Sequence, residues 1–351
     1  SETTFLDLPH KELRALASKF IGLIQNFGVH ASAILVFPSS PNQWCAIEKQ
    51  GDNFVAGLDY HFLEEQGLLK IDILGLKELD IIGETLKNIP DKVDINNLPI
   101  EDEKTVQLLR QGKTLGIFQL ESQGMTELLV KLKPIGFIDV APLVALYRPG
   151  PLDSGMVDVY LRRKNGETIH YLHPKLEKIL HDTQGIILYQ EQILEIARDL
   201  CGYTLGQADV LRRIIGRKEV EKMAPAIAEF VSKGIKCGIE EDIIKTIADQ
   251  IITFALYGFN KAHSFEYGMI AWQTAYLKAH YPKQFITAML NGELGKSAKD
   301  NKSAEYLEEA RRLGINILPP CIKRSHPLWK IEDDGIRVGL RCIKGVGNTF
   351  I

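Results

Sequence analysis

One carboxylate, Asp72, stands inside an otherwise apolar run, LLKIDILGL (residues 68–76). Apolar runs of this length are typical of buried strands, in which successive side chains point to opposite faces. Lys70 and Asp72 therefore share one face, and the apolar residues that alternate with them share the other. Because an unpaired carboxylate in a buried strand costs several kcal/mol, Asp72 needs either a cation or water beside it.

Two alternatives meet that need. Asp72 could form an i, i+2 ion pair with Lys70 on a solvent-facing edge, which involves no ligand. Alternatively, Asp72 could hold a divalent cation while Lys70 contacts a phosphate, because carboxylates hold Mg²⁺ at phosphoryl-transfer sites. A two-metal site needs more than one carboxylate, and the sequence has neither a D-x-D motif nor paired acids on another strand. A catalytic Asp72 would therefore need partners from outside this chain.

A second candidate site is the basic stretch DVLRRIIGRKEVEK (residues 209–222). On a helical wheel Arg212 and Arg213 lie opposite the apolar face, and Arg217 and Lys218 follow the glycine that suits the helix end. A triphosphate or a nucleic-acid backbone offers the complementary charge, and arginine binds phosphate through two parallel hydrogen bonds. The alternative is a solvated basic helix end whose field is weakened by the acids on either side of it.

The segment GFNKAHSFEYG (residues 258–268) is a third candidate, because it leads into the helix predicted over residues 264–280. We expect Ser264 to cap that helix, which places Asn260, Lys261 and His263 just ahead of the helix N-terminus. Free N–H groups and the helix dipole favour anions there, so these three side chains predict a phosphate or sugar site. Packed polar side chains are the alternative.

Two further residues complete the candidate set. Tyr267 lies four residues after His263, so the two side chains can line one wall on the same helix face. In YRPGP (residues 147–151), two prolines fix φ and Gly150 permits a left-handed conformation, which predicts a rigid turn. Arg148 on that turn is a phosphate ligand if the turn faces the site, and a structural residue otherwise.

The composition is that of an ordinary globular protein rather than a membrane, fibrous or disordered one. Of 351 residues, 45% are apolar and 25% are charged, and the formal net charge of −3 gives no hint of nucleic acid. The five cysteines form no C-x-x-C pair, which predicts neither a zinc site nor a disulfide framework. The sequence shows no membrane span or signal peptide, so we expect a cytoplasmic protein. The start without methionine and the end in mid-pattern predict an excised piece of a longer chain.

Apolar spacing predicts an α+β region followed by a mostly helical one. The first region has a helix that closes at Gly28, a strand in ASAILVFPSSP (residues 31–41) and a second strand at residues 68–76. Helices are then expected over residues 184–201, 205–215, 219–234, 240–256, 264–280 and 304–314, with Pro282 ending the fifth of these. The last residues predict two short strands and the start of a new helical module.

Several strings occur in an order that carries a resemblance to a known family. LLKIDILGLKEL, GIFQLESQGM, ALYRPGPLDSGMVDVYLRRKNG, LGQADVLRRIIGRK and FNKAHSFEYGMIAWQTAYLKAHYPKQF resemble the bacterial replicative DNA polymerases of the C family, from about residue 10 to the end. The resemblance implies a partial polymerase-beta-like palm over residues 1–90 and helical fingers over residues 91–330. It also implies the truncated start of a tandem helix-hairpin-helix region over residues 331–351.

The resemblance also implies roles for these residues. Asp72 matches the third catalytic aspartate of the palm, which binds Mg²⁺, and the other two aspartates belong upstream. Lys70, Arg148, Arg212, Arg213, Lys218, Asn260, Lys261, His263 and Tyr267 become candidate ligands of nucleotide or DNA phosphate.

The implied function is template-directed addition of deoxynucleotides to a primer 3′ end by a two-metal mechanism. Primer–template DNA, deoxynucleoside triphosphates, a sliding clamp, a clamp loader and other replisome subunits are the implied partners, with no membrane. With one aspartate of three, we expect this chain alone to be inactive. The alternative is a non-catalytic nucleotide- or DNA-binding module, either a split or a degenerate polymerase piece.

Overall fold

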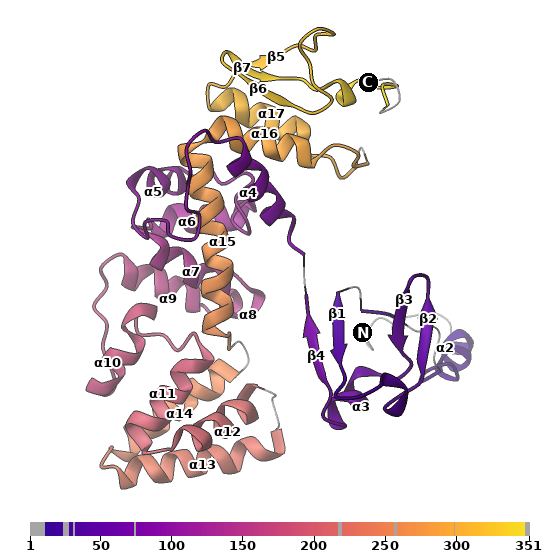
Figure 1. Ribbon diagram of the computed structural model, residues 1–351. Helices are drawn as coiled ribbons and strands as arrows, with labels where there is room; N and C mark the ends of the chain where they lie inside the picture. The colour runs from indigo at the N-terminus through magenta and orange to yellow at the C-terminus, as the bar shows by residue number, and fades with distance from the viewer. Residues whose placement is uncertain are drawn as a thin grey trace. The chain divides into compact units, whose positions relative to one another are not determined.

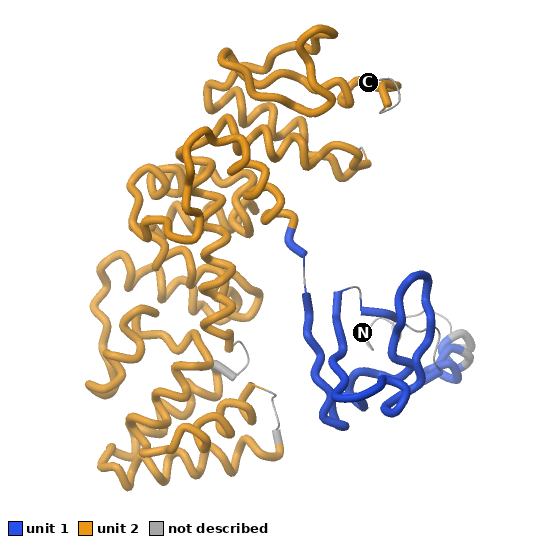
Figure 2. The backbone as a smooth tube through the Cα atoms, viewed as in Figure 1, with its two compact units in different colours: residues 1–76 blue, residues 77–351 orange. Residues whose placement is uncertain are grey.

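The computed structural model describes residues 11–23, 28–30, 32–73, 75–216, 220–255, 258–297 and 299–347. These residues belong to two compact units, residues 1–76 and residues 77–351, which Figure 2 colours separately. Small sheets accompany many helices, which confirms the α+β fold class. The domain boundaries expected near residues 90 and 330 stay predictions. No helix in the described ranges is both long enough and apolar enough to cross a membrane.

Unit 1 combines short strands with short helices around a small apolar cluster. Its helical elements are α2 (Lys11–Ser18), η1 (Pro41–Gln43) and α3 (Tyr60–Glu65), and its strands are β1 (Ala33–Val36), β2 (Ile47–Gln50), β3 (Asn53–Ala56) and β4 (Leu69–Asp72). Strands β1 and β4 pair antiparallel, as do β2 and β3. The cluster consists of buried Cys45, Leu63 and Leu68, with partly buried neighbours that include Leu35 of β1.

Two predictions for unit 1 need correction. The first helix ends at Ser18 rather than Gly28, and the chain turns at Gly22 in a left-handed conformation (φ 86°); residues 24–27 lie outside the described ranges. The strand that holds Asp72 is not buried, since Leu69 and Ile71 are 60% and 44% exposed. These two residues face the exposed Val36 and Ile34 of β1, so an apolar run did not produce a buried strand here.

Unit 2 is mostly helical (Figure 1). Its first helices are α4 (Lys77–Lys87), α5 (Glu103–Arg110), α6 (Gln123–Leu132), α7 (Phe137–Leu146), α8 (Pro149–Asp153), α9 (Met156–Lys164), α10 (Pro174–Leu180) and η2 (His181–Thr183). They are followed by α11 (Gln190–Cys201), α12 (Leu205–Gly216), α13 (Val220–Lys236), α14 (Glu241–Ala255), α15 (Lys261–His280), α16 (Pro282–Gly292) and α17 (Ser303–Arg312). The chain then forms β5 (Ile317–Leu318), β6 (Lys330–Glu332), β7 (Gly335–Arg337) and η3 (Leu340–Cys342), with the strands in the order β5-β7-β6.

Most of the predicted helices are present with small shifts at their ends, and the two terminal strands correspond to β6 and β7. The helix predicted from residue 184 begins only at Gln190, because Gln184 and Gly185 both adopt left-handed conformations that a helix cannot contain. Gly150 is not in a left-handed turn either, since it lies inside α8. The short strand β5 was not predicted, and it pairs parallel to β7.

The cap of α15 was predicted at the wrong residue. The helix begins at Lys261, and the side chain of Asn260 accepts a hydrogen bond from the His263 N–H at 2.8 Å. Ser264 is instead buried in the first turn, where its hydroxyl donates to the carbonyl oxygen of Ala141 in α7 at 2.7 Å. Asparagine and serine are both good caps, so tertiary packing decided between them.

Helix α15 is the central element of unit 2 and packs against α4, α5, α7 and α16 (Figure 1). Trp272, at its middle, is fully buried, and its indole N–H donates to the Pro99 carbonyl at 2.9 Å. One apolar cluster joins α15 to α5, α6, α7 and α9. A second cluster is formed by the five helices α10, α11, α12, α13 and α14, and a third lies around α4, α16 and α17. This packing fixes the N-terminal end of α15, where Asn260, Lys261, His263 and Tyr267 lie.

The contact between α15 and α7 depends on Gly268. A Cβ atom at this position would lie 2.8 Å from the Cα atom of Ala141, which is closer than such atoms approach. We therefore expect Gly268→Ala to lower the free energy of unfolding by about 1–3 kcal/mol, because the two helices must separate. Chemical denaturation measures this change.

Gly83 in α4 provides the matched control, since a Cβ atom there would meet nothing within 4 Å. Gly83→Ala should leave stability unchanged or raise it by up to about 1 kcal/mol, because alanine is the better helix former. Equal stability of the Gly268→Ala variant and the native chain would contradict the close packing of α15 on α7.

Candidate nucleotide and DNA-phosphate site

Asp72 and Lys70 form an ion pair on strand β4. The Lys70 Nζ atom lies 3.1 Å from Asp72 Oδ1, and the His30 Nε2 atom lies 3.9 Å from the same oxygen. Lys70 also lies over the Tyr60 ring, 4.8 Å from its centroid. The Asp72 side chain is 45% exposed, so water and a cation both reach it. The ion pair of the simpler alternative is thus present, and it leaves the carboxylate accessible.

The described residues do not form a complete metal site. No group of three or more His, Cys, Asp or Glu side chains within them could hold a metal ion together. Asp72 offers one carboxylate, whereas Mg²⁺ takes six oxygen ligands and a two-metal site needs several carboxylates. Two Mg²⁺ ions therefore do not fit the described residues of this chain alone.

The start of α15 is held by a carboxylate from another helix. Glu191, in the first turn of α11, accepts hydrogen bonds from the Asn260 side-chain amide and from the Lys261 backbone N–H, both at 2.9 Å. The anion position that was predicted for a phosphate is thus taken by Glu191. Because 70 residues separate Glu191 from Lys261, only packing brings them together.

A row of rings that contact one another at tilted angles, which we call the ring row, begins beside the start of α15: Phe259, His263, Tyr267 and Phe118. Their successive centroids lie 5.3, 4.1 and 5.4 Å apart. The Arg148 guanidinium lies over the Phe259 ring, 4.7 Å from its centroid. The structure therefore brings Arg148, through the Phe259 ring, beside the face of α15 that carries His263 and Tyr267, although Arg148 comes from a different part of the chain.

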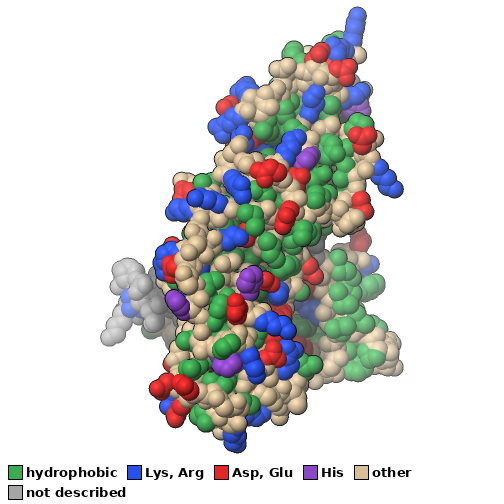
Figure 3. All heavy atoms as spheres, turned by 90° about the vertical axis from the view of Figure 1, so that its left-hand side faces the viewer, with side chains coloured by type: hydrophobic (Ala, Val, Ile, Leu, Met, Phe, Trp, Pro, Cys, Tyr) green, Lys and Arg blue, Asp and Glu red, His purple; other side chains and the backbone are tan. Residues whose placement is uncertain are grey.

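Arg212 and Arg213 are held by one carboxylate. Asp209 accepts from Arg212 Nη2 at 2.8 Å and pairs with Arg213 Nε at 3.1 Å. The hydrogen bond from Arg212 is the main cause that lowers the pKa of Asp209. Lys218 lies outside the described residues. Figure 3 likewise shows Lys and Arg side chains interspersed with Asp and Glu side chains on the face that it displays.

The first turn of α11 links these groups. Gln190 accepts a hydrogen bond from Arg212 Nη1 at 3.1 Å, while the next residue, Glu191, holds the start of α15. Gln190 also donates its backbone N–H to the Phe259 carbonyl at 2.9 Å. Arg212, Asn260 and Lys261 thus surround one helix terminus, next to the ring row. Asp72 and Lys70 belong to the other compact unit, unit 1.

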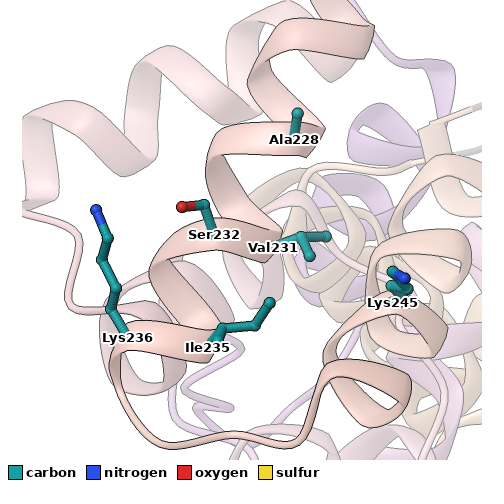
Figure 4. A pocket seen from close by; sticks show the side chains of 6 residues that line it. All are labelled: Ala228, Val231, Ser232, Ile235, Lys236 and Lys245. Atoms are coloured by element: carbon teal, nitrogen blue, oxygen red, sulfur yellow. The ribbon is translucent and has the colours of Figure 1, made fainter.

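A separate open depression lies on α13 and α14 (Figure 4). Its lining is largely apolar, with two lysines, and none of the predicted site residues contributes to it: Ala228, Val231, Ser232, Ile235, Lys236 and Lys245. Lys245 is already paired with Glu241 at 2.6 Å. The depression therefore has no connection to the predicted chemistry.

Comparison with known proteins assigns the chain to a family. Residues 78–238 match the bacterial DNA polymerase III alpha subunit finger domain, residues 6–75 match the bacterial DNA polymerase III alpha NTPase domain, and residues 314–351 match a helix-hairpin-helix motif.

The curated relatives are DNA polymerase III alpha subunits. Identity is 43% to the protein of Aquifex aeolicus, 40% to that of Pseudomonas aeruginosa and 39% to that of Escherichia coli K12, each over 96% of this chain. The chain spans only 29–30% of the length of these relatives. The resemblance stated from the sequence is thereby confirmed, and the chain belongs to the family of bacterial DNA polymerase III alpha subunits.

Proposed function

We propose that this chain provides nucleotide- and DNA-phosphate contacts of a template-directed replicative DNA polymerase. The observation that supports this most directly is the ring row beside Arg148 and the start of α15. Aromatic side chains next to cationic side chains are the combination that binds unpaired nucleotides, because bases stack on aromatic rings and every nucleotide carries a phosphate. In this proposal the ring row meets a base or sugar, and the neighbouring cations meet phosphate oxygens.

The acids near these cations fit the same proposal. Asp209 is 41% exposed, so an incoming phosphate can replace it as the partner of Arg212 and Arg213 at little cost in desolvation. Glu191 holds Asn260 and Lys261 in place, and it competes with any anion for the start of α15. A triphosphate carries more charge than either carboxylate and would bind where the protein already orients its donors.

For the whole protein we propose attack of the primer 3′ hydroxyl on the α-phosphate of a deoxynucleoside triphosphate, with release of pyrophosphate. Mg²⁺, when bound, would stabilise the negative charge of the transition state, and Asp72 would be one of its three carboxylate ligands. The described residues fit no complete metal site, so we propose that the 351-residue chain alone does not extend primers. Lys70 would then hold Asp72 in position and contact a phosphate.

The proposed partners follow from the proposed reaction. They are primer–template DNA and deoxynucleoside triphosphates, together with a sliding clamp, a clamp loader and other replisome subunits. The match of residues 314–351 to a helix-hairpin-helix motif supports contact with a DNA backbone. We place the whole protein in the cytoplasm, where bacterial replication takes place.

The alternative is a binding module without catalysis. The lack of a group of three or more metal-binding side chains among the described residues favours it for this chain, because Asp72 by itself does not make a two-metal site. Both proposals predict DNA binding by the ring row and differ only in what the whole protein does.

The test measures binding of a fluorescein-labelled primer–template DNA to the 351-residue chain. Fluorescence anisotropy gives the affinity at several salt concentrations. We expect affinity to fall steeply with salt, since phosphate contacts release counterions. Arg148→Ala should weaken binding and lower the salt slope by about 1, the share of one phosphate contact. Arg311→Ala is the control, because Arg311 is an exposed arginine of α17 that pairs with Glu308.

Two outcomes would contradict the proposal. If the native chain does not bind DNA at low salt, the proposed phosphate contacts are wrong. If Arg148→Ala and Arg311→Ala change the DNA affinity equally, Arg148 does not belong to the binding site. Addition of Mg²⁺ and the four deoxynucleoside triphosphates to the same mixture tests catalysis, and we expect no primer extension by this chain.

A further inference from the structure

Gln119 adopts a backbone conformation that its residue type disfavours. Its φ angle is 56°, in the left-handed region, and Gln119 does not follow a helix. Among the described residues, two other non-glycine residues share this conformation: Lys133 ends α6 and Gln184 ends η2. A left-handed residue is the ordinary way to end a helix, so only Gln119 of these three lacks that reason.

The turn that contains Gln119 is held firmly by its neighbours. The Leu120 N–H donates to the Ile117 carbonyl at 3.0 Å, and both of these side chains are fully buried. The Phe118 N–H donates to the Thr274 hydroxyl of α15 at 3.2 Å, across 156 residues. Such anchoring is what allows a disfavoured conformation to persist, and such conformations concentrate at functional sites.

The same turn places Gln119 at one end of the ring row. Phe118, the preceding residue, is the last ring of the row; it is buried and lies 5.4 Å from the partly exposed Tyr267, so a base would meet Tyr267 rather than Phe118. Gln119 itself is exposed, and its amide makes no hydrogen bond to the described residues. Glycine would adopt this conformation without a steric penalty, yet the chain places there a side chain with two donors and one acceptor.

We propose that the Gln119 amide hydrogen-bonds the edge of a nucleobase held against the ring row. This inference rests on the proposed function and names a residue that positions the base. Every base carries a hydrogen-bond acceptor on the edge that faces the minor groove in a duplex. One amide donor can therefore hold any base without selecting a sequence, as template-directed copying requires.

Two substitutions separate the amide from the backbone. Gln119→Gly removes the amide and relieves the disfavoured φ angle, whereas Gln119→Ala removes the amide and keeps that angle disfavoured. We expect both variants to bind fluorescein-labelled primer–template DNA about 3- to 10-fold more weakly than the native chain, the loss of one hydrogen bond. The melting temperature of Gln119→Gly should equal or exceed that of the native chain.

Gln184→Gly is the matched control, because Gln184 has a φ angle of 55° but ends η2 rather than extending the ring row. It should keep native affinity and should not lower the melting temperature. Three outcomes would overturn the inference. They are native DNA affinity in both Gln119 variants, a loss of DNA affinity in Gln119→Gly but not in Gln119→Ala, and a lowered melting temperature of Gln119→Gly.

The outcome for His263→Ala distinguishes the inference from the proposed function. Weaker binding by His263→Ala with native binding by both Gln119 variants would overturn only the role of Gln119. Absence of DNA binding by the native chain would overturn the proposed function and this inference together.

Discussion

Lys278→Met is expected to lower the free energy of unfolding by about 3–5 kcal/mol, as is typical when one partner of a buried ion pair is removed. Lys278 is fully buried in α15, and its Nζ atom donates to Glu309 Oε1 at 2.6 Å and to the carbonyls of Lys113 and Leu115 at 2.9 and 2.8 Å. Burial lowers the pKa of Lys278, and the hydrogen bond from its ammonium group to Glu309 opposes that shift. Methionine would leave a buried carboxylate and two carbonyls without their donor.

The control is an exposed ion pair of equal length. Lys245 and Glu241 of α14 also lie 2.6 Å apart, but both side chains are more than half exposed. Lys245→Met should leave the free energy of unfolding almost unchanged, because water screens the pair. Urea denaturation of the two variants and the native chain compares these costs.

A double substitution tests the cause of the loss. Adding Glu309→Leu to Lys278→Met removes the uncompensated charge, so we expect part of the stability to return. Equal stability of the Lys278 and Lys245 variants would contradict the assignment of Lys278 as the buried link between α15, α17 and the turn at residues 113–115.

The second large effect is expected at Asp72 in a whole-length alpha subunit that carries this sequence. In the proposed function Asp72 is a metal ligand, so we expect Asp72→Asn to slow Mg²⁺-dependent primer extension by about 10³-fold, since loss of such a ligand removes several kcal/mol of charge stabilisation in the transition state. Single-turnover primer extension measures this rate. Stability should change by less than about 1 kcal/mol, because the pair with Lys70 is partly exposed.

Asp80→Asn is the control for this substitution. Asp80 is an exposed carboxylate in the first turn of α4, eight residues further along the chain. The rate of primer extension by this variant should equal that of the native protein. A native rate for Asp72→Asn would exclude Asp72 as a metal ligand and would leave the exposed ion pair with Lys70 as its role.

Much of the helical part of the fold was predictable from the sequence. Helices α12, α14 and α17 begin and end within two residues of the predicted positions, and the family was identified from whole strings of residues. Local patterns suffice for these features, because a helix depends on neighbours three and four residues away. The contact of His263 with Tyr267 follows from the same spacing.

Other features required the tertiary structure. The sequence could not choose between Asn260 and Ser264 as the cap of α15, because both residue types cap helices and only burial against α7 distinguishes them. It also predicted a buried strand at β4, because an apolar run does not reveal how many neighbours cover it.

The sequence by itself determined the family, the fold class and the residue types that could bind phosphate. Only the tertiary structure placed Glu191 at the start of α15, Phe118 at the end of the ring row and Lys278 beside Glu309. The physical reason is distance along the chain. Turns and helices are decided by residues within a few positions, whereas the hydrogen bonds that Glu191, Phe118 and Lys278 make with Lys261, Thr274 and Glu309 span 31 to 156 positions and exist only because the cores of unit 2 pack as they do.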